Sequence, residues 1–437
     1  MKQTTAGNTL MNSMKIKPIF IIGVLFFVFG FISWINAILI PYFQIVCELS
    51  SLQSMMVAFA FYISYFVMAI PSSYLLNKTG FKNGMIIGLL IMAAGAIIFI
   101  PAAMTSTYSL FLTGLFIQAT GLTILQSAAN PYVTILGPIE SAAKRISIMG
   151  VCSKVAGAIA PIILIRAITN NPDEIDQLKQ QLIVATADVK STILDQLGGR
   201  LIIPYMFLAV SFFALGFLIK AAHLPDVEIS EEDLVLQNEG ESKTSILQYP
   251  YLLLGAFAVF CAVSVEVLSV DSIINYAQYQ GYSFREAKFF ATYTLIIMIL
   301  SYLAGIVLIP KFIQQRKVLQ LCAIAGLVIS CCVMLFAGKS SVWLLSLLGL
   351  SNALLWPTIW PLAIDGLGKF TKQGSALLIM GVAGGALFPL FYGFFSDHFN
   401  PQTAYWILIP CYGFILYYAT RGYRIGKENK LLVNKGL

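Results

Sequence analysis

Residues 18–46 read PIFIIGVLFFVFGFISWINAILIPYFQIV, and this stretch contains no charged side chain. A helix that crosses the hydrocarbon core of a bilayer needs roughly 20 consecutive apolar residues, so the stretch is long enough for one crossing. It is too long for the apolar core of a cleavable secretory signal, and the residues before it, 1–17, are polar. The stretch therefore predicts a membrane-spanning helix that stays in the protein.

The rest of the chain repeats this pattern. Hydrophobic residues make up 58% of the 437 residues and charged residues only 11%, whereas soluble domains carry about 25% charged residues. Lipid accommodates this composition because a helix satisfies its own backbone hydrogen bonds there. Short polar joints separate twelve apolar stretches, which predict an all-α polytopic membrane protein with spans at 18–46, 52–77, 83–104, 108–136, 145–169, 201–222, 250–279, 286–310, 317–338, 341–366, 373–396 and 402–421.

The lysines and arginines that lie between the spans or near their ends predict the orientation, because cytoplasmic segments carry an excess of positive charge. With the N-terminus in the cytoplasm, the inner segments hold 19 of these residues and the outer segments hold 7. Both termini then lie in the cytoplasm, which requires an even number of spans. The sequence thus predicts a multi-pass protein of the cell inner membrane.

The twelve predicted spans divide into two sets of six, and related residues recur in both sets. Asn130-Pro131 corresponds to Trp356-Pro357 at an offset of 226, and Ala156-Gly157 corresponds to Gly384-Gly385 at an offset of 228. Two similar six-helix bundles joined by a cytoplasmic loop are typical of the major facilitator fold. We therefore expect an N-terminal tail at 1–17, bundles at 18–222 and 250–421, a polar cytoplasmic linker at 223–249 and a C-terminal tail at 422–437.

Several motifs resemble the bacterial fucose/glucose/galactose permease family. The longest is LQSAANPYVTILGP at 125–138, and the others are WINAILIP at 34–41, WPTI at 356–359, GS at 374–375 and GFFSD at 393–397. The resemblance covers nearly the whole chain. It implies a sugar carrier in which helices 1, 4, 7 and 10 line a central cavity, as well as proton symport of the kind found in the fucose branch.

Three positions depart from that fucose branch. Ala37 and Gln126 occupy positions where the resemblance implies a titrating Asp and Glu, and Tyr302 lies near the position of an Arg. Ala and Gln do not titrate. The glucose/galactose branch is therefore the better match, and we expect any coupling ion, H⁺ or Na⁺, to bind elsewhere in the chain.

Three charged residues lie deep inside predicted spans and form a candidate coupling network. They are Lys154 in span 5 and Glu266 and Asp271 in span 7. A charge at the bilayer centre costs at least roughly 2.5–3.5 kcal/mol, so such residues usually have a function or a partner. Lys154 can pair with one acid and leave the other for an ion or for sugar hydroxyls. The alternative is a buried pair that only locks the two bundles together.

Amide and indole side chains within spans 1, 4, 7 and 10 form a candidate sugar site. A sugar presents hydroxyl groups and an apolar ring face, which suit amides and aromatic rings. Amides and indoles also serve as packing contacts between helices, and this alternative stays open for each residue alone. The predicted sugar-binding residues are Asn36, Gln118, Gln126, Asn130, Asn275, Asn352, Trp356 and Trp360, and Trp34 adds a third ring.

Other function classes lack their usual motifs. The two histidines, His223 and His398, lie at span ends, and the chain has no HExxH, GxSxG or Walker sequence. The seven cysteines show no metal-binding spacing. We therefore expect no enzyme, no metal site, no cofactor and no nucleic-acid partner, but a monomer in the bilayer that imports a hexose such as glucose or galactose by cation-coupled symport. A uniporter, a carrier of fucose or N-acetylglucosamine, and a sugar sensor with a transporter fold remain alternatives.

Overall fold

The computed structural model describes residues 18–49, 51–135, 139–168, 174, 181, 186–221 and 245–427. Within these ranges every regular element is a helix. This confirms the predicted all-α class. Residues 223–244 of the predicted linker, the whole predicted N-terminal tail and residues 428–437 of the predicted C-terminal tail lie outside the described residues, so the division of the chain into domains stays a prediction.

The first group of helices covers the N-terminal part of the chain. Its members are α2 (Pro18–Val46), α3 (Ser51–Met104), α4 (Tyr108–Ile135), η1 (Ile139–Ser141), α5 (Ala142–Ile168), α7 (Ala187–Gly199) and α8 (Ile202–Ala221). The long element α3 is interrupted at Gly80, whose φ of 75° and ψ of 174° are not helical. Glycine adopts such a positive φ readily because it has no Cβ. The break falls between predicted spans 2 and 3.

The second group of helices covers the C-terminal part. Its members are η2 (Ile246–Gln248), α10 (Pro250–Asp271), α11 (Ile273–Tyr279), α12 (Phe284–Leu308), α13 (Gln315–Leu335), α14 (Lys339–Asn352), α15 (Leu355–Ile364), η3 (Gly368–Phe370), α16 (Thr371–Met380), η4 (Gly381–Ala383), α17 (Gly384–His398), η5 (Thr403–Ile407), α18 (Leu408–Thr420) and η6 (Gly422–Arg424). Predicted spans 7, 10 and 11 are therefore each divided into shorter helices.

The division of span 10 has a clear cause in the sequence. Proline has no backbone N–H, so Pro357 cannot donate to the carbonyl of Ala353, and its ring crowds that turn. The helix accordingly stops at Asn352 and resumes at Leu355. The hydroxyl of Thr358 donates to the carbonyl of Leu354 at 2.5 Å and so satisfies a backbone group near the break.

Nine helices among the described residues are long and apolar enough to cross a membrane. One of them, Met56–Met104, has 49 residues. A straight helix of this length would measure about 73 Å, more than twice the roughly 30 Å of hydrocarbon, so this stretch must cross twice, with its turn at Gly80. The total of twelve spans stays a prediction.

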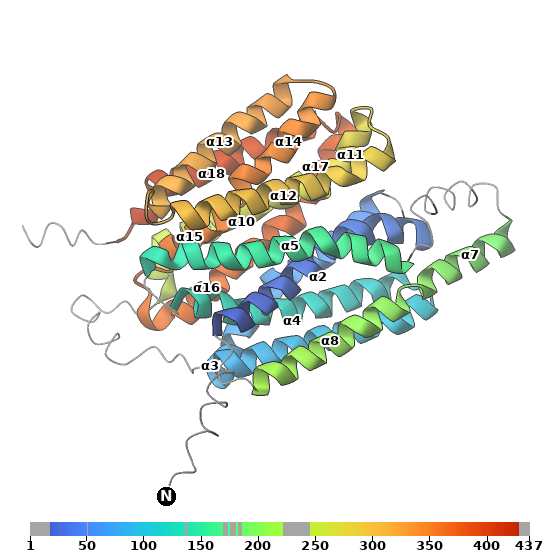
Figure 1. The fold of residues 1–437 in the computed structure, drawn as a ribbon, viewed down its shortest axis with the longest axis horizontal. Helices are drawn as coiled ribbons and strands as arrows, with labels where there is room; N and C mark the ends of the chain where they lie inside the picture. The colour runs from blue at the N-terminus through green and yellow to red at the C-terminus, as the bar shows by residue number, and fades with distance from the viewer. Residues whose placement is uncertain are drawn as a thin grey trace, which may run out of the picture.

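The two groups form two bundles that lie side by side, the blue-to-green helices below and the yellow-to-red helices above in Figure 1. Helix α5 of the first bundle packs against α12 of the second, and α3 packs against α16 and α17. Large apolar side chains point outward, including Phe207, Phe217 and Leu335, which are 72%, 72% and 81% exposed. Such an outer surface suits lipid and not water.

Candidate functional site

A cavity of about 140 Å³ lies between the two bundles, near the middle of the helices that surround it. It is smaller than the roughly 300–1,000 Å³ of sites for drug-sized ligands, which suits a small molecule. Helices α2, α3, α4 and α5 contribute to its wall from one bundle, and α10, α12, α15 and η4 contribute from the other. The polar and aromatic residues of the wall are Phe26, Phe29, Ser33, Trp34, Tyr62, Tyr65, Gln126, Asn130, Ser153, Lys154, Glu266, Tyr302 and Trp356.

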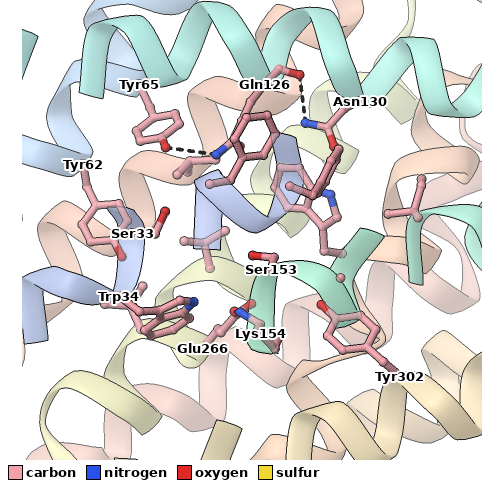
Figure 2. A pocket seen from close by; sticks show the side chains of 18 residues that line it. Ser33, Trp34, Tyr62, Tyr65, Gln126, Asn130, Ser153, Lys154, Glu266 and Tyr302 are labelled. Atoms are coloured by element: carbon pink, nitrogen blue, oxygen red, sulfur yellow. Dashed lines mark hydrogen bonds and ion pairs between the residues drawn. The ribbon is translucent and has the colours of Figure 1, made fainter. Parts of the chain in front are cut away.

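An ion pair joins the two bundles across this cavity. Nζ of Lys154 on α5 contacts Oε1 of Glu266 on α10 (Figure 2), and the two side chains are only 7% and 16% exposed. Lys154 is 12 residues beyond the start of α5, and Glu266 is 16 residues beyond the start of α10 and five residues before its end, where α11 continues the span. Removing one partner would leave an uncompensated buried charge, which is strongly destabilising.

The Lys154 ammonium has a second neighbour in its own bundle. Its Nζ lies 4.3 Å from the centroid of the Trp34 ring on α2. The ring lies directly against α5 at Gly157, where a Cβ would overlap its Cδ1 atom. An ammonium over the face of an indole is stabilised by the ring quadrupole. Lys154 therefore contacts one group in each bundle.

The second predicted acid, Asp271, lies at the end of α10, next to the break between α10 and α11 at Ser272. It is partly exposed and is not part of the cavity wall. It lies within electrostatic range of both Glu266 and Lys154, yet the ion pairs between described residues do not include it. With all three groups ionised, this triad of Lys154, Glu266 and Asp271 carries a net charge of −1.

Two amides of α4 form one side of the cavity. Nε2 of Gln126 donates to the hydroxyl of Tyr65 at 3.1 Å, and Nδ2 of Asn130 donates to the backbone carbonyl of Gln126 at 2.9 Å (Figure 2). The Asn130 side chain is buried, and its Oδ1 has no hydrogen-bond partner among the described residues. Because its amide nitrogen is already engaged, Asn130 offers a fixed acceptor to a ligand hydroxyl.

Two indoles supply apolar surface to the cavity. Trp34 and Trp356 both belong to its wall. The fully buried ring of Trp360 stacks on Trp356 with centroids 5.2 Å apart. Trp360 therefore supports the second ring from behind and does not itself face the cavity.

The remaining predicted sugar-binding residues lie away from the cavity wall. Gln118 is buried against α3 near Gly95 and has no hydrogen-bond partner in the described structure. Asn352 holds α14 to its neighbours through Ser269 and Tyr412, and Asn275 is exposed. The side chain of Asn36 lies outside the described part of the chain.

The sequence predicted no site role for three tyrosines of the wall, Tyr62, Tyr65 and Tyr302, although Tyr302 lies near the position of an Arg in the fucose branch. Two of them contact a glycine of the opposite bundle. A Cβ at Gly150 on α5 would lie 2.5 Å from the Tyr302 ring, and one at Gly385 on α17 would lie 3.1 Å from the Tyr62 ring. Both contacts require glycine, the first much more strictly than the second. Among the 20 tyrosines of the chain, no sequence signal distinguishes Tyr62 and Tyr65.

No group of three His, Cys, Asp or Glu side chains gathers within the described ranges in a way that would hold a metal ion. The cavity instead combines a paired lysine and glutamate, amides, hydroxyls and indole faces. Such a set binds a small polar molecule through hydrogen bonds and ring contacts.

Known proteins are similar in sequence to most of this chain. Residues 22–383 match the family model described as "Major Facilitator Superfamily". A glucose/galactose transporter of Brucella abortus is 32% identical over 401 residues, which cover 91% of this chain and 92% of the relative. The L-fucose-proton symporter of Escherichia coli is 30% identical over 409 residues, which cover 92% of both chains.

A solved structure gives the same result for the fold. The crystal structure of the Escherichia coli fucose:proton symporter FucP superimposes with a TM-score of 0.77 at 28% sequence identity. The superposition covers 93% of this chain and 99% of FucP. The predicted all-α membrane fold of the major facilitator type is therefore confirmed.

Proposed function

Because the chain belongs to the Major Facilitator Superfamily, we propose that it is a secondary active transporter that imports a monosaccharide across the bacterial inner membrane by alternating access. The two bundles, 18–222 and 250–421, rock about the central cavity and expose it to one side at a time. The observation that carries the proposal is the ion pair between Lys154 and Glu266, which bridges the bundles at the wall of a cavity lined by amides and indoles.

The chemistry of the cavity favours a hexose as the substrate. Asn130 offers an acceptor, Gln126 and Tyr65 form a hydrogen-bonded pair, and two indoles offer apolar faces. A pyranose needs these features together. Glucose and galactose are the first candidates, because the relatives of highest identity reported above include a glucose/galactose transporter. Fucose and N-acetylglucosamine are further candidates for the same assay.

The net charge of the triad favours coupling of transport to one monovalent cation. Lys154 neutralises Glu266, so the net charge of −1 belongs in effect to Asp271 at the helix break. Half-helix ends in transporters coordinate Na⁺ or H⁺ in this way. A proton or a sodium ion on Asp271 makes the triad neutral, and a neutral triad moves through the change of access at a lower electrostatic cost. The Lys154–Glu266 ion pair then holds the two bundles together and breaks once in each transport cycle.

The proposal includes the orientation of the protein in the membrane and its monomeric state. The excess of lysine and arginine places both termini in the cytoplasm. The beginning of α2 and the end of α18 lie at the same end of the molecule, on the left of Figure 1, which supports this arrangement. One chain contains both bundles and the whole cavity, so a monomer suffices for transport.

Purified protein in sealed liposomes tests the proposal. We expect counterflow of radiolabelled glucose or galactose without any ion gradient, and uphill accumulation when a proton or sodium gradient is imposed. Asp271→Asn should abolish accumulation but retain counterflow. Asp397→Asn is a matched control because it makes the same change at an exposed helix end, and it should accumulate sugar as the wild type does.

Each alternative has its own result in this assay. Counterflow without accumulation under either gradient would indicate a uniporter. Sugar binding without any flux would indicate a sensor with a transporter fold. Accumulation in Asp271→Asn equal to that of the wild type would remove Asp271 from the coupling step.

A further inference from the structure

We propose that Trp34 is a positioning residue for transport, because its ring holds the Lys154 ammonium while the ion pair with Glu266 opens and closes. This inference rests on the proposed function, since it assumes that the two bundles separate around the cavity. It goes further by giving Trp34 a role toward a charge of the protein. Its position in the cavity wall would otherwise suggest only a platform for sugar.

Two contacts hold the Trp34 ring within its own bundle. The ring on α2 lies beneath the Lys154 ammonium of α5 at 4.3 Å, and it is only 5% exposed. Gly157, one turn beyond Lys154 on α5, receives the indole because a Cβ there would overlap the ring. Helices α2 and α5 also meet closely at Gly30, where a Cβ would overlap the carbonyl oxygen of Ser153. Trp34 and Lys154 therefore move together as one rigid unit.

Glu266, in contrast, belongs to the other bundle and moves away when the bundles separate. An ammonium left without its carboxylate in a low-dielectric interior is strongly disfavoured. The indole face stabilises a desolvated cation, and it stays in place because Gly157 seats it. Trp34 thereby lowers the free-energy cost of breaking the ion pair. It also holds the Lys154 ammonium in the position in which Glu266 can pair with it again.

The competing explanation is that Trp34 acts only on the sugar. A platform for sugar would work in the same way whether or not Lys154 carries a charge. A positioning residue acts through Lys154, so its effect disappears when the charge is removed. Residues that act through one another give non-additive effects, and independent residues give additive ones.

A double-mutant comparison separates the two explanations. Trp34→Leu is made in the wild type and in the charge-free background Lys154→Met/Glu266→Gln, and counterflow of a radiolabelled sugar that the wild type transports is measured in liposomes. We expect Trp34→Leu to slow counterflow about tenfold in the wild type but less than about twofold in the charge-free background. Trp34→Phe, which keeps an aromatic face, should restore part of the wild-type rate.

Trp356→Leu is the matched control. Trp356 also lies in the cavity wall, and its described partner is the ring of Trp360. Its substitution should therefore slow counterflow by the same factor in both backgrounds. Gly157→Ala supplies a second variant, because it displaces the indole without removing it, and it should give the same pattern as Trp34→Leu.

Thermal unfolding in detergent covers the case in which the charge-free background does not transport. Trp34→Leu should lower the unfolding temperature more in the wild type than in Lys154→Met/Glu266→Gln. Equal losses in both backgrounds, in rate or in unfolding temperature, would overturn the role of Trp34. Absence of sugar movement in the wild type would instead overturn the proposed function, so the two failures are distinguishable.

Discussion

The two bundles meet along two seams that differ in chemistry. At the first seam, α5 faces α10 and α12, and it contains the Lys154–Glu266 ion pair and the Tyr302 ring on Gly150. At the second seam, α3 faces α17, and the ring of Tyr62 lies on Gly385. Opening the first seam separates opposite charges, whereas opening the second re-exposes an aromatic ring. The first seam is therefore the part of the interface that a bound cation or sugar can regulate.

This difference has an energetic basis. Breaking a buried ion pair by removing one partner costs about 3–5 kcal/mol. Parting two apolar surfaces costs about 25 cal/mol for each Å² exposed, a cost that a bound cation does not change. A ligand changes an equilibrium only by the difference of its affinities for the two states, so the charged seam gives a cation much more to act on. We expect substitutions at the first seam to have larger effects than those at the second.

The largest effect should come from Lys154→Met. This change leaves Glu266 in the interior without its partner and removes the cation above Trp34. We expect a loss of about 3–5 kcal/mol in stability and a reduction of counterflow by about 100-fold or more. Thermal unfolding in detergent and counterflow in liposomes measure the two effects. A variant as stable as the wild type would show that the ion pair does not control the opening of the first seam.

The next largest effect tests whether Lys154 and Glu266 only hold the two bundles together or also bind sugar. Lys154→Met/Glu266→Gln removes both charges and leaves no unpaired group, which is often nearly neutral for stability. We expect its unfolding temperature to lie within a few degrees of the wild type and counterflow to recover to within about tenfold. Should the double variant be as inactive as Lys154→Met alone, at full stability, the two charges would bind sugar directly.

A third variant, Gly150→Ala, affects the first seam without changing any charge. The added Cβ would lie 2.5 Å from the Tyr302 ring, and such overpacking costs about 1–3 kcal/mol. In the proposed orientation this contact lies on the cytoplasmic side, so the variant should favour the state that is open to the cytoplasm. Ser153→Cys, in a variant without the seven native cysteines, reports this opening through a membrane-impermeant thiol reagent.

We expect the reagent to react with this cysteine about fivefold faster from the cytoplasmic side in Gly150→Ala than in the parent, in keeping with a change of about 1 kcal/mol. An unchanged rate would mean that Tyr302 can move aside and that the contact with Gly150 does not close the cavity.

The sequence predicted much of this interface and missed one class of residue. Charged residues within apolar stretches are rare and costly, and this rule alone identified Lys154 and Glu266, which the structure brings together. Gln126 and Asn130 were predicted from their amides within span 4, and both lie in the cavity wall; residues four apart share one helix face.

The tyrosines and some of the amides could not be assigned in this way. Tyr62 and Tyr302 face the cavity because distant helices meet there, and a local pattern contains no record of that packing. Gln118, like Gln126, is an amide within the apolar stretch of span 4, yet α3 approaches it closely at Gly95 and encloses it between helices. An amide in an apolar stretch thus reveals that it has a buried environment, but not whether that environment is a cavity or another helix.

The smallest effect should come from Gly385→Ala at the second seam. Its Cβ would lie 3.1 Å from ring atoms of Tyr62 and from a methyl group of Val267, so neighbours need to move by only a few tenths of an ångström. We expect counterflow to fall less than about threefold and accumulation to persist, because overpacking this mild lies at the low end of about 1–3 kcal/mol. Gly413→Ala is the matched control, since nothing lies within 4 Å of its Cβ position, and it should behave as the wild type. If Gly385→Ala impaired counterflow as strongly as Gly150→Ala, the two seams would contribute equally to the change of access, and the control assigned to the charged seam would have to be shared between them.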